Sequence, residues 1–339
     1  MIRIEDLAFS YGTNEVLKNI NLTLSDGHIY GLLGENGVGK TTLLTLLCGL
    51  KKCKQGSISI DGKNPYDRQP SLLGNLFYLS DEVAAINMKA IGYARNYGKF
   101  WPNFELDTFY EIMQLLENDC EQKMNKMSCG QLKKTYIAFA LACRCKYLFM
   151  DEPTNGLDIP SKSQFRKAVM KYTSDESIVL ISTHQVRDLE DIIDPIIILD
   201  SHEVLLNASL EEISDKLWFN YGGEYRQDAL YTEQTPSGMI QVCVNAEKVE
   251  SKVNVEALFN TAHLHKDLIR SAFNGTPSVE AVEPVSVEKP EPVSEEAPEP
   301  VSVEAPVPEK EETSVLDRED ESRFMPKADD EQNPDELDK

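Results

Sequence analysis

Short apolar runs alternate with longer segments of helical periodicity along the first two thirds of the chain. Ile2-Arg3-Ile4 and Leu22-Thr23-Leu24 place apolar residues at every second position, which predicts strands with one covered face. The segment from Gly56 to Gly62 predicts a further strand that closes in an Asp-Gly turn. Because strands and helices alternate in this way in α/β domains, we predict an α/β fold with a mainly parallel sheet over residues 1–208.

A helical region interrupts this alternation. From Asp81 to about Lys126 the pattern predicts helices, and apolar residues recur on one face at spacings of three and four residues. These residues are Leu106, Phe109, Tyr110, Met113 and Leu116. We interpret the aromatic side chains as part of a core rather than a ligand site, and we expect a helical subdomain at about residues 82–143.

Beyond Asn207 the pattern becomes less regular. A helix is predicted around Leu210–Leu217, and strands are predicted near Met239–Val244. We interpret residues 209–275 as a small C-terminal α+β addition. The sequence does not reveal its purpose.

From about Thr276 the composition changes sharply. Glu283-Pro284-Val285-Ser286 is followed at eight-residue intervals by two further Glu-Pro-Val-Ser segments. Proline removes backbone donors, glutamates repel one another and little except valine is available to bury. We therefore predict that residues 276–339 form a disordered, acidic, Pro-, Glu- and Val-rich tail. A partner-docking arm and a solvated tail without a sharp role are both open interpretations.

The net charge of the chain is concentrated in that tail. Residues 276–339 hold 21 acidic and 6 basic residues, a net charge of −15 out of −23 for all 339 residues, which leaves −8 on the rest. The remaining part is mildly acidic and shows no broad electrostatic footprint for nucleic acid, so we expect no nucleic-acid partner.

The N-terminal sequence, the apolar runs and the cysteines indicate the cellular compartment. Met1 to Asp6 carries acids where a secretory signal needs an apolar core, and apolar runs such as Ile196–Leu199 are too short to span a bilayer. We expect a cytoplasmic protein that reaches a membrane only through a partner. The seven cysteines form no paired Cys-x-x-Cys framework, which favours reduced thiols over a metal site.

The most informative stretch is Gly34-Glu35-Asn36-Gly37-Val38-Gly39-Lys40-Thr41, which fits the phosphate-loop pattern. Glycines let successive backbone N–H groups turn inward around a polyphosphate, Lys40 can reach the terminal phosphates, and the Thr41 hydroxyl can ligate magnesium. A chance glycine-rich turn is disfavoured, because a predicted strand at Ile29–Leu33 enters the loop and a predicted helix at Lys40–Leu47 leaves it. The stretch predicts binding of ATP or GTP.

A second chemical signal is the apolar run from Tyr147 to Met150, which ends in Asp151 and Glu152. In phosphate-loop proteins an aspartate at such a strand tip holds the magnesium ion opposite the loop hydroxyl. Glu152 would then stand where a carboxylate can orient or deprotonate an attacking water. An apolar strand that ends in two acids is common, so the signal gains its meaning from Lys40 and Thr41.

Five motifs together resemble those of ATP-binding cassette (ABC) ATPases. They are the phosphate loop, Met127-Ser128-Cys129-Gly130-Gln131, the Asp151-Glu152 strand, Asn155-Gly156-Leu157-Asp158 and Ser182-Thr183-His184. Their order and intervals are those of the family, and the resemblance covers about residues 1–208. It implies a mixed β-sheet with a helical subdomain, ATP and Mg²⁺ as cofactors, and ATP hydrolysis.

The resemblance also implies roles for single residues. Tyr11 matches the aromatic residue that stacks on adenine, and Gly34 to Thr42 match the phosphate-binding loop, with Lys40 also catalytic. Ser128, Cys129, Gly130 and Gln131 match the signature motif, which faces the ATP held by a second cassette. Glu152 matches the catalytic carboxylate, His184 the histidine that contacts the γ-phosphate, and Asp158 the aspartate that couples the two sites. Read singly, Tyr11 could be a plain edge-strand aromatic and His184 a helix cap.

Two departures from the family pattern stand out. Met127 and Cys129 replace a leucine and a glycine of the signature, and export-type cassettes often tolerate other residues there. Asp81, in Ser80-Asp81-Glu82, stands where the family places a glutamine that touches magnesium and the transmembrane partner. Related export ATPases often carry an acid at that place. Together with Thr41 and Asp151, Asp81 completes the expected metal set.

The resemblance favours the ATP-hydrolysing subunit of a transporter. Such a subunit acts as a pair of cassettes on the inner face of the cell membrane and drives a separately encoded multi-span permease, here with a lean to bacterial export. A soluble cassette ATPase without transport function and a nucleotide-binding scaffold with little turnover are the alternatives. One phosphate loop and the lack of sustained heptads argue against translation-type and DNA-maintenance relatives.

Overall fold

The computed structural model describes residues 1–222, 225–236 and 238–274. The predicted acidic tail at 276–339 lies outside the described residues.

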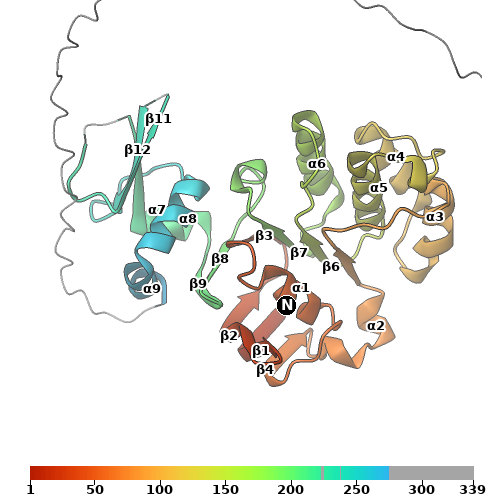
Figure 1. The fold of residues 1–339 in the computed structure, drawn as a ribbon, viewed down its shortest axis with the longest axis horizontal. Coiled ribbons are helices and arrows are strands. Elements are labelled where there is room, and N and C mark those ends of the chain that lie inside the picture. Colours follow the sequence, from red (N-terminus) through yellow and green to blue (C-terminus); the bar gives the residue numbers. More distant parts are fainter. Residues whose placement is uncertain (223–224, 237, 275–339) are drawn as a thin grey trace, which may run out of the picture. The chain divides into compact units, whose positions relative to one another are not determined.

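The central sheet has the strand order β5-β6-β7-β3-β8-β9 (Figure 1). Its first five strands are parallel, and β9 runs antiparallel to β8. The strands are β3 (His28–Leu33), β5 (Leu76–Leu79), β6 (Tyr147–Asp151), β7 (Ile178–Thr183), β8 (Ile196–Asp200) and β9 (Glu203–Ala208). Because β6, β7 and β8 are buried along their whole length, their sequences are continuous apolar runs, as expected for parallel strands covered on both faces.

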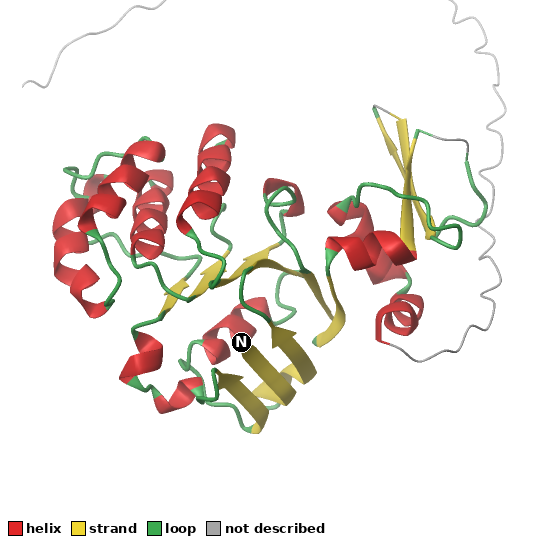
Figure 2. Ribbon diagram, turned by 180° about the vertical axis from the view of Figure 1, so that it is seen from behind, coloured by secondary structure: helices red, strands yellow, loops and turns green. Residues whose placement is uncertain are grey.

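A second, antiparallel sheet has the order β2-β1-β4. Its strands are β1 (Ile2–Tyr11), β2 (Asn14–Leu24) and β4 (Gln55–Ile60). Ile2 pairs with Leu24 on one side and with Ile60 on the other, and all three are buried, which confirms the predicted alternation. Helix α1 (Lys40–Leu47) lies between this sheet and the central one (Figure 2), and its leucines share one hydrophobic cluster with both. The phosphate-loop segment is therefore anchored from two sides.

Helix α2 (Pro70–Leu73) precedes β5, and the helical region contains α3 (Ala90–Tyr97), α4 (Leu106–Leu115) and α5 (Cys129–Ala142). Helix α6 (Ile159–Tyr172) follows β6. Short 3-10 turns occupy Pro65–Asp67, Gly98–Phe100, Met124–Lys126 and Val186–Asp188. The predicted apolar face of α4 is confirmed, since Phe109, Met113 and Leu116 are buried.

The expectation of helix from Asp81 onward is wrong for residues 81–89, because the first long helix begins at Ala90. The backbone carbonyl of Asp81 accepts a hydrogen bond from the Lys133 ammonium (2.5 Å), and that of Ala84 accepts one from the Tyr136 hydroxyl (2.8 Å). Side chains of α5 thus satisfy the acceptors that helix formation would otherwise have used.

The C-terminal segment forms a third sheet with the order β10-β12-β11, flanked by three helices. Its elements are α7 (Leu210–Lys216), β10 (Leu217–Tyr221), β11 (Tyr231–Thr235), β12 (Gly238–Val244), α8 (Val255–Leu264) and α9 (Lys266–Asn274). The helix and strand predicted near Leu210 and Met239 are confirmed, whereas β10, β11, α8 and α9 were not predicted. Helix α9 packs against β9, and Ile269 joins the hydrophobic cluster that contains Ile198 and Leu206. No helix of the described residues is long and apolar enough to cross a membrane.

Candidate functional site

A cleft of about 380 Å³ opens where the carboxyl ends of β3 and β6 meet the start of α1. In open α/β sheets this edge is where ligands bind. The lining residues are Tyr11, Asn14, Val16, Asn36, Gly37, Gly39, Lys40, Thr41, Thr42, Asp81, Asp151 and Glu152. Residues predicted from four separate segments of the chain therefore share one cleft.

The phosphate loop depends on glycine at two places in particular. Gly39 has φ 117°, and a Cβ added there would lie 2.7 Å from the Val16 carbonyl oxygen. A Cβ on Gly34 would lie 2.8 Å from the Leu199 carbonyl oxygen. Such distances do not occur for real side chains, so the loop can approach β2 and β8 this closely only without Cβ atoms.

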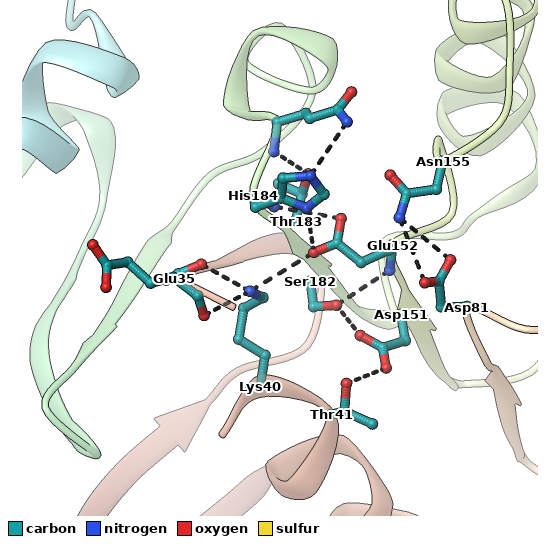
Figure 3. A network of polar contacts seen from close by, with 12 residues as sticks. Glu35, Lys40, Thr41, Asp81, Asp151, Glu152, Asn155, Ser182, Thr183 and His184 are labelled. Atoms are coloured by element: carbon teal, nitrogen blue, oxygen red, sulfur yellow. Dashed lines mark hydrogen bonds and ion pairs between the residues drawn. The ribbon is translucent and has the colours of Figure 1, made fainter. Parts of the chain in front are cut away.

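The Lys40 side chain folds back over this loop (Figure 3) and is only 6% exposed. Its ammonium donates to the carbonyl oxygens of Gly34 (2.7 Å) and Glu35 (3.2 Å). Burial lowers the pKa of Lys40, and the nearby carboxylates of Glu152 and Asp151 oppose that shift. A desolvated cation held by neutral carbonyls is well placed to exchange them for an anionic oxygen.

Asp151 is 2% exposed, yet its hydrogen-bond partners are hydroxyl groups. The Thr41 hydroxyl donates to Oδ2 at 2.5 Å, the Tyr78 hydroxyl donates to the same oxygen at 3.4 Å, and the Ser182 hydroxyl donates to Oδ1. Within the described residues, no ion pair involves Asp151. A buried carboxylate beside a threonine hydroxyl, without a cation of its own, fits a hard divalent ion such as Mg²⁺.

Glu152 follows at the tip of β6 with a left-handed backbone, φ 45°. Its N–H donates to the Ser182 carbonyl oxygen (3.1 Å), which fixes the residue between β6 and β7. Its Oε1 lies 2.9 Å from Nδ1 of His184 and 3.7 Å from Nζ of Lys40, but neither contact has hydrogen-bond alignment. A buried carboxylate oxygen with spare acceptor capacity therefore faces the phosphate loop.

His184 stands above this carboxylate (Figure 3). Its backbone N–H donates to Glu152 Oε2 at 3.4 Å, and its Nε2 lies 3.3 Å from Nε2 of Gln185. Because the amide nitrogen of Gln185 can only donate, Nε2 of His184 is the acceptor and Nδ1 carries the hydrogen that faces Glu152. The ring is exposed on the outer side of the site.

Asp81 reaches the cleft, but its carboxylate has other partners. Oδ1 lies 3.2 Å from Nζ of Lys133, whose side chain is almost fully buried, and 3.4 Å from Nδ2 of Asn155. The second oxygen, Oδ2, has only a 3.5 Å contact with Nδ2 of Asn155, so Asp81 shares its charge with Lys133, whereas Asp151 has no ion-pair partner among the described residues.

Tyr11 lies at the outer wall of the cleft, and its side chain is 47% exposed. Its hydroxyl is 3.3 Å from Oγ1 of Thr42, and Nζ of Lys51 lies 4.9 Å from the ring centroid. The ring thus has a cation near one face, and its stacking on adenine stays a prediction.

The signature segment does not line this cleft. Ser128 caps α5: its hydroxyl accepts from the N–H of Gln131 (3.2 Å), and the Gln131 side chain accepts from the Ser128 N–H (2.9 Å). The hydroxyl hydrogen of Ser128 stays free to donate, and Cys129 is exposed. A Cβ on Gly130 would lie 3.0 Å from the Gly156 carbonyl oxygen, so the helix begins against the loop that follows Glu152.

Asp158 serves as a helix cap within this chain. Its Oδ1 accepts from the N–H of Ser161 at 3.0 Å at the start of α6, and this hydrogen bonding holds the pKa of Asp158 below its usual range. The carboxylate is otherwise exposed.

Sequence reasoning missed three supporting roles: the Ser182 and Tyr78 hydroxyls that hold Asp151, and the Lys133 ammonium that holds Asp81. Ser182 belongs to β7 and Tyr78 belongs to β5, and these two strands are the neighbours of β6. Their contacts follow from strand order, which the local sequence does not carry. Lys133 resembles an ordinary polar position of an amphipathic helix.

A larger cleft of about 730 Å³ lies at the opposite edge of the central sheet, where the strands begin. Asn75, Lys146 and Ser177, which line it, immediately precede β5, β6 and β7. No residue of the predicted site belongs to it.

Comparison with known proteins identifies the family. A family model described as ABC transporter matches residues 17–155. The Bacillus subtilis protein named uncharacterized ABC transporter ATP-binding protein YdbJ is 31% identical over 216 residues, which cover 62% of this chain and 70% of YdbJ. This chain belongs to the ABC transporter ATP-binding protein family. It is an ABC ATPase, and its nucleotide is ATP.

Other relatives agree with this assignment. The bacitracin transport ATP-binding protein BcrA of Bacillus licheniformis is 30% identical over 228 residues, which cover 64% of this chain and 72% of BcrA. The solved structure of a dimeric bacterial ABC transporter cassette matches with a TM-score of 0.56 at 23% identity, over 62% of this chain and 99% of that cassette. At that identity the structural likeness shows the fold alone, and the fold is the mixed α/β architecture predicted from the sequence.

Proposed function

We propose that this ABC ATPase hydrolyses ATP in the cleft between the phosphate loop and the tip of β6, with Glu152 as the catalytic carboxylate. The observation that carries this proposal is the Oε1 atom of Glu152, a buried acceptor without an aligned hydrogen bond on the wall of the cleft. Such an oxygen can orient a water molecule and take its proton as the water attacks the γ-phosphate.

The neighbouring groups bind the phosphates, the adenine and the metal ion. The backbone N–H groups from Gly34 to Thr42 and the Lys40 ammonium bind the phosphates, and Tyr11 stacks on the adenine. Thr41 and Asp151 would hold Mg²⁺, with Asp81 as an outer contributor. A bound Mg²⁺ neutralises charge on the phosphate oxygens. His184, which lies between Glu152 and Gln185, contacts the γ-phosphate.

The signature segment acts on a second copy of the site. Ser128 has a free hydroxyl hydrogen, the start of α5 presents unpaired N–H groups, and the segment is outside the cleft of its own chain. These features support a pair of cassettes in which Ser128 to Gln131 of one chain complete the ATP site of the other, with Asp158 near the junction.

We further propose that the pair drives a separately encoded multi-span permease, and that transport is outward. Support comes from relatives named for bacitracin and lantibiotic transport, and from Asp81 and Cys129, which follow the export-type pattern. The location would then be the inner face of the membrane, through the permease.

The test is Glu152→Gln in the full chain. General-base catalysis contributes roughly 10²- to 10⁴-fold, so kcat for ATP hydrolysis should fall by that factor while the Kd for ATP stays within about twofold. Steady-state phosphate release and calorimetric ATP titration measure the two quantities. Glu105→Gln, at the larger cleft, is the matched control and should leave both unchanged. Unaltered turnover in Glu152→Gln would contradict the catalytic assignment.

A further inference from the structure

The turn between β8 and β9, residues 200–203, joins the phosphate loop to the C-terminal helices. A cavity of about 300 Å³ lies at this junction. It is lined by Glu35, Asn36, Gly37, Val38, Leu199, Asp200, Ser201, His202, His263 and Lys266. The back of the nucleotide site and the ends of α8 and α9 therefore meet at a single short turn.

His202 connects this turn to the phosphate loop. Its Nδ1 lies 3.1 Å from the carbonyl oxygen of Val16 in β2 and 3.3 Å from that of Val38 in the loop. Both oxygens only accept, so Nδ1 carries a hydrogen that the two share. The backbone carbonyl of His202 in turn accepts from the N–H of Lys18 at 2.9 Å.

The backbone of the turn is strained where His202 sits. Ser201 has φ 49° and His202 has φ 71°, left-handed conformations that glycine adopts without strain and that are uncommon for other residues. A histidine in this conformation costs stability unless its side chain gains contacts that compensate. The two carbonyl contacts of Nδ1 are such a compensation.

Holding the Val38 carbonyl has a consequence for nucleotide binding. In a planar trans peptide the C=O of one residue and the N–H of the next point in opposite directions. When His202 holds the Val38 carbonyl from behind, it also fixes the direction of the Gly39 N–H. Gly39 lines the ATP cleft, and its N–H is one of the loop donors that a phosphate needs.

The other residues of the turn tie it to the C-terminal helices. Asp200 lies 2.7 Å from Nδ1 of His263 and accepts from the Lys266 ammonium at 2.5 Å, and that ammonium also donates to the Ser201 hydroxyl at 3.1 Å. Glu203 lies 2.8 Å from the Arg270 guanidinium in α9. The C-terminal segment thus fixes both ends of a turn whose middle residue holds the phosphate loop.

We propose that His202 is a positioning residue for ATP binding, and that α8 and α9 set its position through Asp200 and Ser201. His202 orients the Val38–Gly39 peptide, and the C-terminal helices hold the turn that carries His202. This gives the C-terminal segment a role in nucleotide affinity. The proposal rests on the proposed function, because it takes the phosphate loop as the ATP site.

The first test compares His202→Gly with His202→Asn in the full chain. Both residues accept a positive φ and neither adds charge, but only asparagine has an N–H donor at the position of Nδ1. We expect His202→Gly to raise the Kd and the KM for ATP by about tenfold, the effect of losing one orienting hydrogen bond, with kcat within about twofold. His202→Asn should restore affinity to within about threefold of the wild type. Equal affinities in the two variants would overturn the proposal.

The second test addresses the C-terminal helices and does not depend on whether a His202 variant folds. Lys266→Met removes the contact to Asp200 and Ser201, and Lys216→Met is its matched control. The two lysines are equally exposed, at 33% and 34%, and Lys216 pairs with Glu212 within the same segment, away from the turn. Lys266→Met should raise the Kd for ATP about threefold, as expected for one partly exposed ion pair, while Lys216→Met leaves it unchanged.

The outcomes separate this proposal from the proposed function. If the wild type binds ATP and Lys266→Met binds it as tightly as Lys216→Met does, the link to the C-terminal helices is wrong. If the wild type itself binds no ATP in calorimetric titration, the proposed ATP site is at fault.

Discussion

The two clefts at opposite edges of the central sheet differ in how their charged groups are paired. At the amino ends of the strands, Arg144 lies 2.8 Å from Glu105 and Lys146 lies 3.0 Å from Asp61. At the carboxyl ends, carbonyl oxygens hold Lys40 and hydroxyl groups hold Asp151. The first cleft is about twice as large as the second, yet its cations already have carboxylate partners. In the smaller cleft the ion-pair partner that the described residues offer to Lys40 is Glu152, whose Oε1 is 3.7 Å from the ammonium. Incompletely neutralised charge, rather than volume, distinguishes the binding site.

The largest expected effect that tests this contrast is that of Lys40→Ala. Loss of a desolvated charged partner costs about 2 kcal/mol or more, so the Kd for ATP should rise at least about 30-fold in calorimetric titration. Lys146→Ala, in the larger cleft, should leave the Kd for ATP unchanged. A comparable loss of affinity in both variants would remove the distinction between the clefts.

An intermediate effect is expected for the carboxylates. Asp151→Asn should weaken Mg²⁺ binding in the presence of ATP by about tenfold, as found when a group that orients a metal or its water is neutralised. The measurement is the Mg²⁺ concentration that gives half-maximal ATP hydrolysis, with excess chelator as the metal-free reference. Asp61→Asn, the corresponding change at the carboxylate that pairs with Lys146 of the larger cleft, should not alter that concentration. A shift of the same size would contradict the assignment.

The smallest effect concerns stability and pH in the larger cleft. Burial alone would raise the pKa of Asp61, but hydrogen bonds from the N-terminal amine, Tyr147 and Lys146 outweigh burial and hold that pKa well below its usual range. Since Lys146 and its partners are partly exposed, Lys146→Ala should cost about 1 kcal/mol or less, a fall in Tm of about 2 °C at pH 7.

The sign of the pH dependence follows from the lowered pKa. The stabilisation is complete above the unfolded-state pKa of about 3.9 and is lost as the pH falls through the folded-state value. The Tm difference between wild type and Lys146→Ala should therefore shrink below about pH 4. A difference that persists unchanged after Asp61 has become protonated in the folded protein would show that Lys146 acts through packing and not through its charge.

Local sequence was sufficient for the elements that carry their own signals. The phosphate loop predicts α1 at Lys40–Leu47 because the pattern, the preceding strand and the apolar helix are contiguous, and the structure has the helix at those residues. The carboxylates at the end of β6 were predicted because Asp151 and Glu152 directly follow an apolar run in the sequence.

Local sequence did not predict contacts whose partners come from distant segments of the chain. The stretch 81–89 is a loop because Lys133 and Tyr136, about fifty residues later, satisfy its carbonyls. His202 gave no signal, since its contacts depend on the packing of β2, β8 and the phosphate loop against one another. The roles assigned to five residues stay predictions: Tyr11, Asp81, Ser128, His184 and Asp158.

The order of the central sheet also constrains how the chain can be made. Strand β3, which leads into the phosphate loop, pairs with β7 and β8. The pairing partner of His28 is Ile178 and that of Gly31 is Ile196, and both partners are synthesised more than a hundred residues later. During synthesis this apolar strand leaves the ribosome long before either neighbour exists, and non-local parallel pairing is slow and open to aggregation. A fragment that ends at Asn155 would keep the phosphate loop, the signature and Glu152, yet its β3 would have no partner in the sheet. The ATP site can therefore form only late in translation, although the phosphate loop is synthesised early.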